Sequence, residues 1–114
     1  MSFEEKRLEE FDRDLAKYAS LRTQIERRRM KILEEPYSLS KTLGSGKWED
    51  LTGKRGAAFR GGNMVFILAI CEECVQNGWQ EKNLPWCGDM CEMRSLKRVV
   101  WIAFAPHDTA YGKK

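Results

Sequence analysis

The fold is decided by residues 64–70, Met64-Val65-Phe66-Ile67-Leu68-Ala69-Ile70, which are apolar at every position. A strand with one solvated face alternates apolar and polar residues, whereas a strand covered on both faces is apolar throughout. The run therefore predicts a central strand. Gly61-Gly62-Asn63 stands directly before it, and these residue types tolerate the positive φ that a tight hairpin turn requires.

A second continuous apolar run covers residues 99–105, and it predicts another central strand that ends at Pro106. On the other side of the glycine-rich turn, residues 48–52 and 55–60 predict two further, shorter strands. The four strands together predict a mainly antiparallel sheet.

The first third of the chain has the periodicity of helices. Apolar residues recur at spacings of three and four in two stripes, which place them on one face of each helix: Leu8, Phe11, Leu15 and Tyr18, then Leu21, Ile25, Ile32 and Leu33. We expect helices over residues 4–18 and 21–34, the second stopped by Pro36, and a loop over 36–47. The predicted class is α+β, with an N-terminal helical hairpin packed on the sheet. Its core should include Leu15, Ile25, Phe66, Ile67, Trp101 and Ile102.

Length and composition set the broad class. The chain has 114 residues, 42% of them hydrophobic and 32% charged, which suits one globular domain over residues 1–114. Residues 71–95 interrupt the strand pattern as a cysteine-bearing insert. No apolar run approaches the roughly 18 residues of a membrane span, and the charged N-terminus has no apolar signal region. We therefore expect a cytoplasmic protein with no membrane partner.

Positive charge gathers in several separate segments. The net charge is only +3, but basic residues cluster at 27–31, 54–60, 94–98 and 113–114. Such clusters suit a phosphate-rich partner, although each also fits an ordinary solvated face. The residues predicted to bind RNA or phosphate are Lys54, Lys97, Arg98 and Lys113.

Several short motifs, in their order and spacing, resemble the RelE/ParE-type toxins of toxin–antitoxin systems. They are Phe11-Asp12-Arg13-Asp14-Leu15, Ile32-Leu33-Glu34-Glu35-Pro36, Leu43, Trp48-Glu49-Asp50-Leu51, Lys54-Arg55, Arg60-Gly61-Gly62-Asn63-Met64-Val65-Phe66 and His107-Asp108-Thr109-Ala110-Tyr111. The resemblance implies a curved sheet of about four strands, with catalytic or binding residues on its concave face. It also implies a cognate antitoxin as partner. That family usually begins with a β-strand, which we expect to be short or missing here because residues 1–8 are charged and do not alternate.

The resemblance implies roles for particular side chains. Cleavage of RNA without a metal requires proton transfer to and from oxygen and stabilisation of the scissile phosphate. His107, the only histidine, or Tyr111 four residues later would transfer protons, and Arg55 and Arg60 would hold the phosphate, with no catalytic cofactor. The alternative is that these are a surface histidine, a packing tyrosine and solvated basic residues.

The four cysteines form two close pairs, Cys71 with Cys74 and Cys87 with Cys91. Two pairs that bracket a loop fit a tetrahedral thiolate site for structural zinc. Four thiols without a metal, or a disulfide, remain open alternatives. Since an insert of this kind is not general in the RelE/ParE family, it suggests a distinct, cysteine-containing subgroup.

Three functions are compatible with the resemblance. The leading hypothesis is a toxin that cleaves mRNA in the ribosome. The first alternative is a non-enzymatic toxin of the ParE kind, which blocks a DNA topoisomerase, and the second is an inactive relative that only binds antitoxin. Met64 stands where the family usually has a phosphate-holding arginine, and this favours the ParE alternative.

Overall fold

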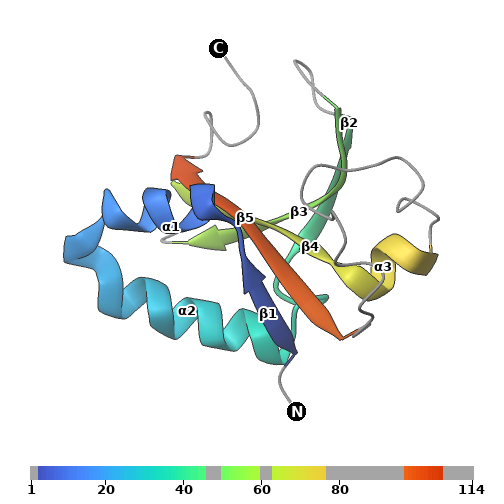
Figure 1. The fold of residues 1–114 in the computed structure, drawn as a ribbon, viewed down its shortest axis with the longest axis horizontal. Helices are drawn as coiled ribbons and strands as arrows, with labels where there is room; N and C mark the ends of the chain where they lie inside the picture. Colours follow the sequence, from blue (N-terminus) through green and yellow to red (C-terminus); the bar gives the residue numbers. More distant parts are fainter. Residues whose placement is uncertain (1–2, 46–49, 60–62, 77–96, 107–114) are drawn as a thin grey trace.

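A computed structural model describes residues 3–45, 50–59, 63–76 and 97–106, and they form two helices packed on a five-stranded sheet with a short third helix (Figure 1). In chain order the elements are β1 (Glu4–Arg7), α1 (Glu9–Ala16), the 3₁₀ turn η1 (Ala19–Leu21), α2 (Arg22–Glu34), β2 (Lys41–Ser45), β3 (Asp50–Phe59), β4 (Met64–Ile70), α3 (Cys71–Gln76) and β5 (Arg98–Pro106). The predicted α+β class is confirmed.

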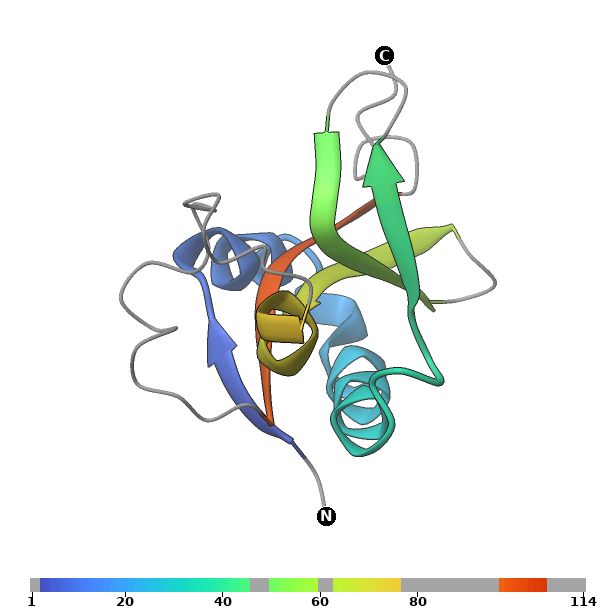
Figure 2. The same cartoon turned by 90° about the vertical axis from the view of Figure 1, so that its right-hand side faces the viewer.

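The strands lie side by side in the order β1-β5-β4-β3-β2. The four strands β2 to β5 pair antiparallel, and β1 adds to the edge of β5 in parallel. Both predicted central strands are confirmed, since β4 covers residues 64–70 and β5 covers 98–106. Figure 2 shows that β3 bends along its length, so the sheet is curved.

Three boundaries differ from the sequence prediction. Residues 4–7 form β1 instead of the start of a helix, because they pair through their backbone with β5 and need no apolar side chains. Residues 41–45 form β2 within the predicted loop, and β3 is one long strand over 50–59 where two shorter ones were expected. An edge strand such as β2 tolerates the serine and glycine that suggested a loop.

Helices α1 and α2 cover one face of the sheet over an aromatic core. The ring of Phe11 stacks on Trp101 with centroids 5.4 Å apart, and Phe66 meets Phe104 at 4.8 Å. Ile25 from α2 is buried in the same cluster. Of the predicted core residues only Leu15 is half-buried, and it packs against this cluster from α1.

The opposite face carries a second apolar cluster, in which Val65, Ile67 and Ala69 of β4 meet Val100 and Ile102 of β5. Helix α3 adds Cys71 and Cys74 to it. Alternate residues of β4 thus enter different clusters, which explains why the strand is apolar throughout.

The free edge of β5 beyond β1 is covered by α1. The Leu8 amide donates to the carbonyl of Trp101 at 3.0 Å, and the Phe104 amide donates to Asp14 Oδ2 at 2.9 Å. The carboxylate of Asp14 therefore accepts the hydrogen bond that a continuation of β1 would accept at that point. Within the described ranges, no helix has both the length and the apolar composition needed to cross a membrane.

Candidate functional site

A hollow of about 390 Å³ lies between α1, the end of β5 and β3. Ile67 and Ile102 of the second cluster line it together with Phe104 and Tyr18 of the aromatic core, so the hollow lies at the free edge of β5. Its polar lining comes from Lys54 of β3, from Glu10 and Asp14 of α1, and from Lys17 and Tyr18, which directly follow this helix. Sequence reasoning proposed Lys54 but missed the contribution of α1, whose only signal was the polar side of its helical stripe.

The charges of this hollow are mixed. Lys17 Nζ lies 3.8 Å from Asp14 Oδ1, and Asp14 also accepts the Phe104 amide. Lys54 is half-buried and lines the hollow. The hollow can therefore attract a phosphate through Lys54 and Lys17, while the carboxylates of α1 limit how many phosphates it accepts.

The strand register brings together the ends of β3 and β5, which lead to two of the predicted catalytic residues. Met64, at the start of β4, pairs with Phe59 on one side and with Pro106 on the other. Neighbouring strands are about 4.8 Å apart, so Phe59 and Pro106 are about 10 Å apart across Met64. Arg60 and His107 follow these two residues in the sequence and lie outside the described residues, as do Tyr111 and Lys113.

Met64 occupies the position between these two ends. Its side chain is half-buried and packs against the aromatic core on the helix-covered face. It therefore contributes apolar packing at the position where the RelE/ParE family usually has an arginine.

Arg55, predicted to hold phosphate, is buried and fully engaged. Its Nη1 lies 2.5 Å from Glu73 Oε2, its Nε donates to Ser40 Oγ at 2.7 Å, and its Nη2 donates to the Ser40 carbonyl at 3.0 Å. The guanidinium carbon also lies 5.3 Å from the centre of the Tyr37 ring. A phosphate could bind Arg55 only by displacing these partners, so the contacts favour a role in joining β3 to α3 and to the segment after α2.

The basic pair Lys97 and Arg98 lies at the opposite end of β5 from Pro106. At about 3.3 Å per residue, the eight steps of this strand separate Arg98 from Pro106 by about 26 Å. Lys97 Nζ lies 5.4 Å from the centre of the Phe3 ring, and Arg98 Nη2 lies 3.9 Å from Glu4 Oε2. These two residues therefore do not share a site with the end of β5 that leads to His107.

Cys71 and Cys74 lie three residues apart on α3, which places both thiols on one side of the helix, and both are buried. The glutamates between them point elsewhere, since Glu73 contacts Arg55 and Glu72 accepts a hydrogen bond from Tyr37. Cys87 and Cys91 lie outside the described residues. Over the ranges that are described, no three His, Cys, Asp or Glu side chains are grouped to hold a metal, so the zinc site stays a prediction.

No family model and no curated protein matches the chain. Among solved structures, the fold is similar to that of a chain in the crystal structure of the toxin–antitoxin complex RelBE2 from Mycobacterium tuberculosis, with a TM-score of 0.59. The two sequences are 17% identical, and the match covers 93% of this chain and 99% of that chain. The protein therefore has the fold of a RelE-type toxin–antitoxin chain, as its sequence motifs indicated.

Proposed function

We propose that this protein is the toxin of a toxin–antitoxin pair and that it cleaves mRNA in the ribosome. The proposal depends on the strand register around Met64. Because Met64 pairs with both Phe59 and Pro106, the ends of β3 and β5 that lead to Arg60 and His107 are about 10 Å apart. A fold shared with a chain of a toxin–antitoxin complex supports the same assignment.

The proposed chemistry needs no metal. His107 or Tyr111 removes the proton from the attacking 2′-hydroxyl and returns one to the leaving oxygen. Arg60 holds the scissile phosphate as its negative charge grows, and Lys54 contributes from the hollow. Lys97, Arg98 and Lys113 are proposed to contact phosphates farther along the RNA, while Arg55 keeps the sheet and α3 together.

A cognate antitoxin is the proposed protein partner. The solved complex with the similar fold contains an antitoxin, and the sheet of this chain ends in two edge strands, β1 and β2. Edge strands present unpaired backbone groups that a partner segment can cover.

One observation favours the topoisomerase-blocking alternative. Met64 packs on the aromatic core instead of offering a guanidinium to RNA, and such a site would have one phosphate contact fewer than the family usually has. A toxin of this kind would act by protein contact, so substitutions of His107, Tyr111 and Arg60 would leave its toxicity intact. An inactive relative would bind antitoxin and arrest nothing.

The test is to express the protein from a tightly controlled promoter and to follow growth, translation, mRNA 5′ ends and the DNA-damage response. We expect arrest of translation with new mRNA ends. His107→Ala, Tyr111→Phe and Arg60→Ala should each lower cleavage by about 10²–10⁴-fold, while the variants still purify with antitoxin. Lys31→Ala is the matched control, because Lys31 is an exposed cation of α2.

Each other outcome would indicate a different function. Arrest without new mRNA ends would contradict the ribonuclease assignment, and arrest with DNA damage would support the topoisomerase-blocking alternative. Normal growth on full expression would indicate the inactive relative.

A further inference from the structure

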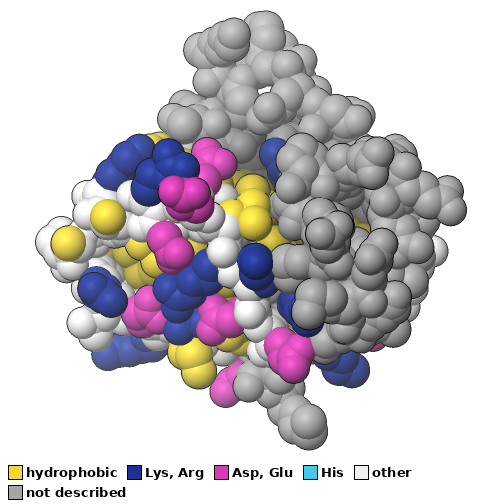
Figure 3. All heavy atoms as spheres, in the orientation of Figure 1, with side chains coloured by type: hydrophobic (Ala, Val, Ile, Leu, Met, Phe, Trp, Pro, Cys, Tyr) yellow, Lys and Arg dark blue, Asp and Glu magenta, His cyan; other side chains and the backbone are white. Residues whose placement is uncertain are grey.

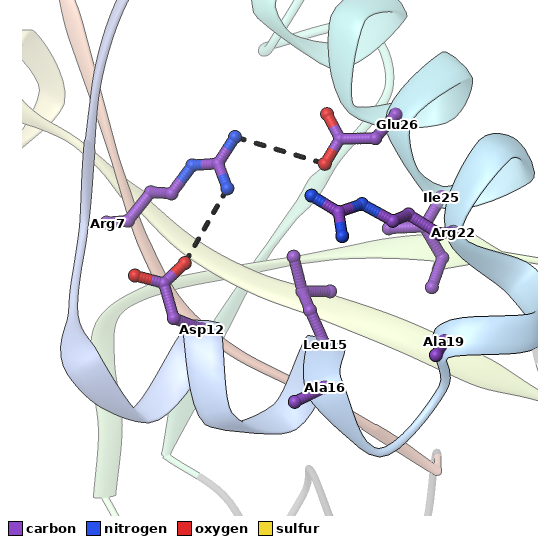
Figure 4. A pocket seen from close by; sticks show the side chains of 8 residues that line it. All are labelled: Arg7, Asp12, Leu15, Ala16, Ala19, Arg22, Ile25 and Glu26. Atoms are coloured by element: carbon purple, nitrogen blue, oxygen red, sulfur yellow. Dashed lines mark ion pairs between the residues drawn. The ribbon is translucent and has the colours of Figure 1, made fainter.

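A second pocket, of about 180 Å³, lies between β1, α1 and α2 (Figure 4). It shares no lining residue with the hollow beside β5. Its apolar lining comes from Leu15, Ala16, Ala19 and Ile25. The charged lining comes from Arg7, Arg22, Asp12 and Glu26. Figure 3 shows basic and acidic side chains close together on this side of the molecule, with apolar atoms visible between them.

Arg7 is only loosely held by its neighbours. Its nitrogens lie 3.5 Å from Glu5, 3.6 Å from Asp12 and 3.9 Å from Glu26. A charge-assisted hydrogen bond is about 2.7–2.9 Å long, so none of these contacts is one. Two of the same carboxylates, Glu5 and Glu26, bind Arg29 at 2.5 Å instead. The guanidinium of Arg7 therefore keeps donors that a ligand can use.

Arg22 has still fewer contacts. Among the described residues, it makes no ion pair and no hydrogen bond, and Figure 4 shows its guanidinium group extending into the pocket between Leu15 and Glu26. Two arginines thus reach one small pocket from different elements, β1 and α2, with unused donors. Arginine presents its donors as a planar fork that matches a carboxylate or a phosphate.

The acidic side chains of the pocket favour a carboxylate over a phosphate as the ligand. Asp12 and Glu26 line the same space as the arginines, so a doubly charged phosphate would be repelled by both. A singly charged carboxylate meets less repulsion, and an amide N–H beside it can donate to Asp12. The apolar wall has room for a small hydrocarbon group, because a cavity of about 150 Å³ already holds benzene.

We propose that this pocket binds a carboxylate carried on a leucine-sized apolar group, with Arg22 and Arg7 as the donors and Asp12 as acceptor for a neighbouring N–H. Two sources supply this chemistry: the C-terminus of a polypeptide and a free acylated amino acid. The proposal does not depend on the toxin assignment, because no residue of the pocket belongs to the catalytic set.

The test is a titration of the full chain with N-acetyl-L-leucine, followed by the NMR signals of the arginine Nε–H groups and by calorimetry. N-acetyl-L-leucinamide, which lacks the carboxylate, should bind at least about tenfold more weakly, and so should N-acetyl-L-leucine to Arg22→Gln. Arg27→Gln, another exposed arginine of α2, is the matched control and should bind normally. Circular dichroism checks that both variants are folded.

The source is distinguished with a six-residue peptide that ends in leucine. Tighter binding of this peptide than of N-acetyl-L-leucine assigns the pocket to a chain end, and equal or weaker binding assigns it to a free acid. The proposal is overturned by absence of saturable binding of both probes to the wild type, by equal binding of acid and amide, by normal binding to Arg22→Gln, or by equally tight binding of inorganic phosphate.

Discussion

Replacing Arg55 by glutamine would separate a scaffold role of this residue from a catalytic one. In the structure the guanidinium joins three parts of the chain: β3 itself, α3 through Glu73, and the segment after α2 through Ser40 and Tyr37. Glutamine cannot reproduce the fork, so the change breaks these contacts together and removes the Arg55 cation from Glu73.

The expected cost follows from burial. The side chains of Arg55 and Glu73 are only 8% and 11% exposed, so solvent screens their attraction little. Removing one partner of such a buried pair costs about 3–5 kcal/mol, a large part of the 5–15 kcal/mol that stabilises a typical domain. For a domain of this size it corresponds to a fall in Tm of about 10–25 °C.

Urea and thermal unfolding of the purified protein measure this loss. Arg13→Gln is the matched control, because Arg13 pairs with Glu9 at 3.8 Å with both side chains largely exposed, and its loss should cost less than about 1 kcal/mol. The double change Arg55→Met with Glu73→Leu should recover much of the stability, since no charge is then left buried. If Arg55→Gln were as stable as wild type yet lost toxicity, the scaffold role would be refuted and the phosphate role restored.

Three further predictions concern the core, the cysteines and one tyrosine. Phe66→Ala should cost about 3–5 kcal/mol, because Phe66 is fully buried and touches several rings; a melting temperature within a degree or two of wild type would contradict its central place. We propose that the four cysteines bind about one zinc per chain, so that chelation lowers Tm; elemental analysis of protein prepared without added metal that finds no zinc would exclude the site. Burial, followed by the hydrogen bond to Glu72, raises the pKa of Tyr37 above its ordinary value. The folded state therefore holds this proton longer than the unfolded state, and wild type should lose stability faster than Tyr37→Phe as the pH rises above about 10; parallel curves for the two proteins would count against the shift.

The central strands were predictable from sequence because burial on both faces requires apolar side chains throughout. Strand β1 was not predictable in this way, because it is held by backbone pairing with β5 and by ion pairs of Glu5 and Arg7 and not by apolar contacts. Its pairing with β5 depends on residues more than ninety positions away, which no local pattern contains.

The candidate site was predictable only in part. Lys54 was proposed to bind phosphate because of its charge, and it lines the hollow. The neighbouring Arg55 was proposed for the same reason, because the sequence does not distinguish the two cations. In the folded state Arg55 forms a buried ion pair with Glu73, eighteen residues later in the chain. A local sequence pattern identifies a cation but not its partner. The predicted roles of Arg60, His107 and Tyr111 stay predictions.

The central place of β5 in the sheet affects how the nascent chain folds during translation. Every residue of β1 pairs with a residue 94 positions later, and β5 lies between β1 and β4. While the ribosome is still making residues 98–106, the growing chain has a gap in its sheet, and the aromatic core lacks Trp101 and Phe104. A chain interrupted at that stage would expose the edge of β4 and the apolar side of α1, the kind of surface that aggregates or recruits chaperones. Assembly of the finished domain is therefore delayed until β5 has emerged from the ribosome.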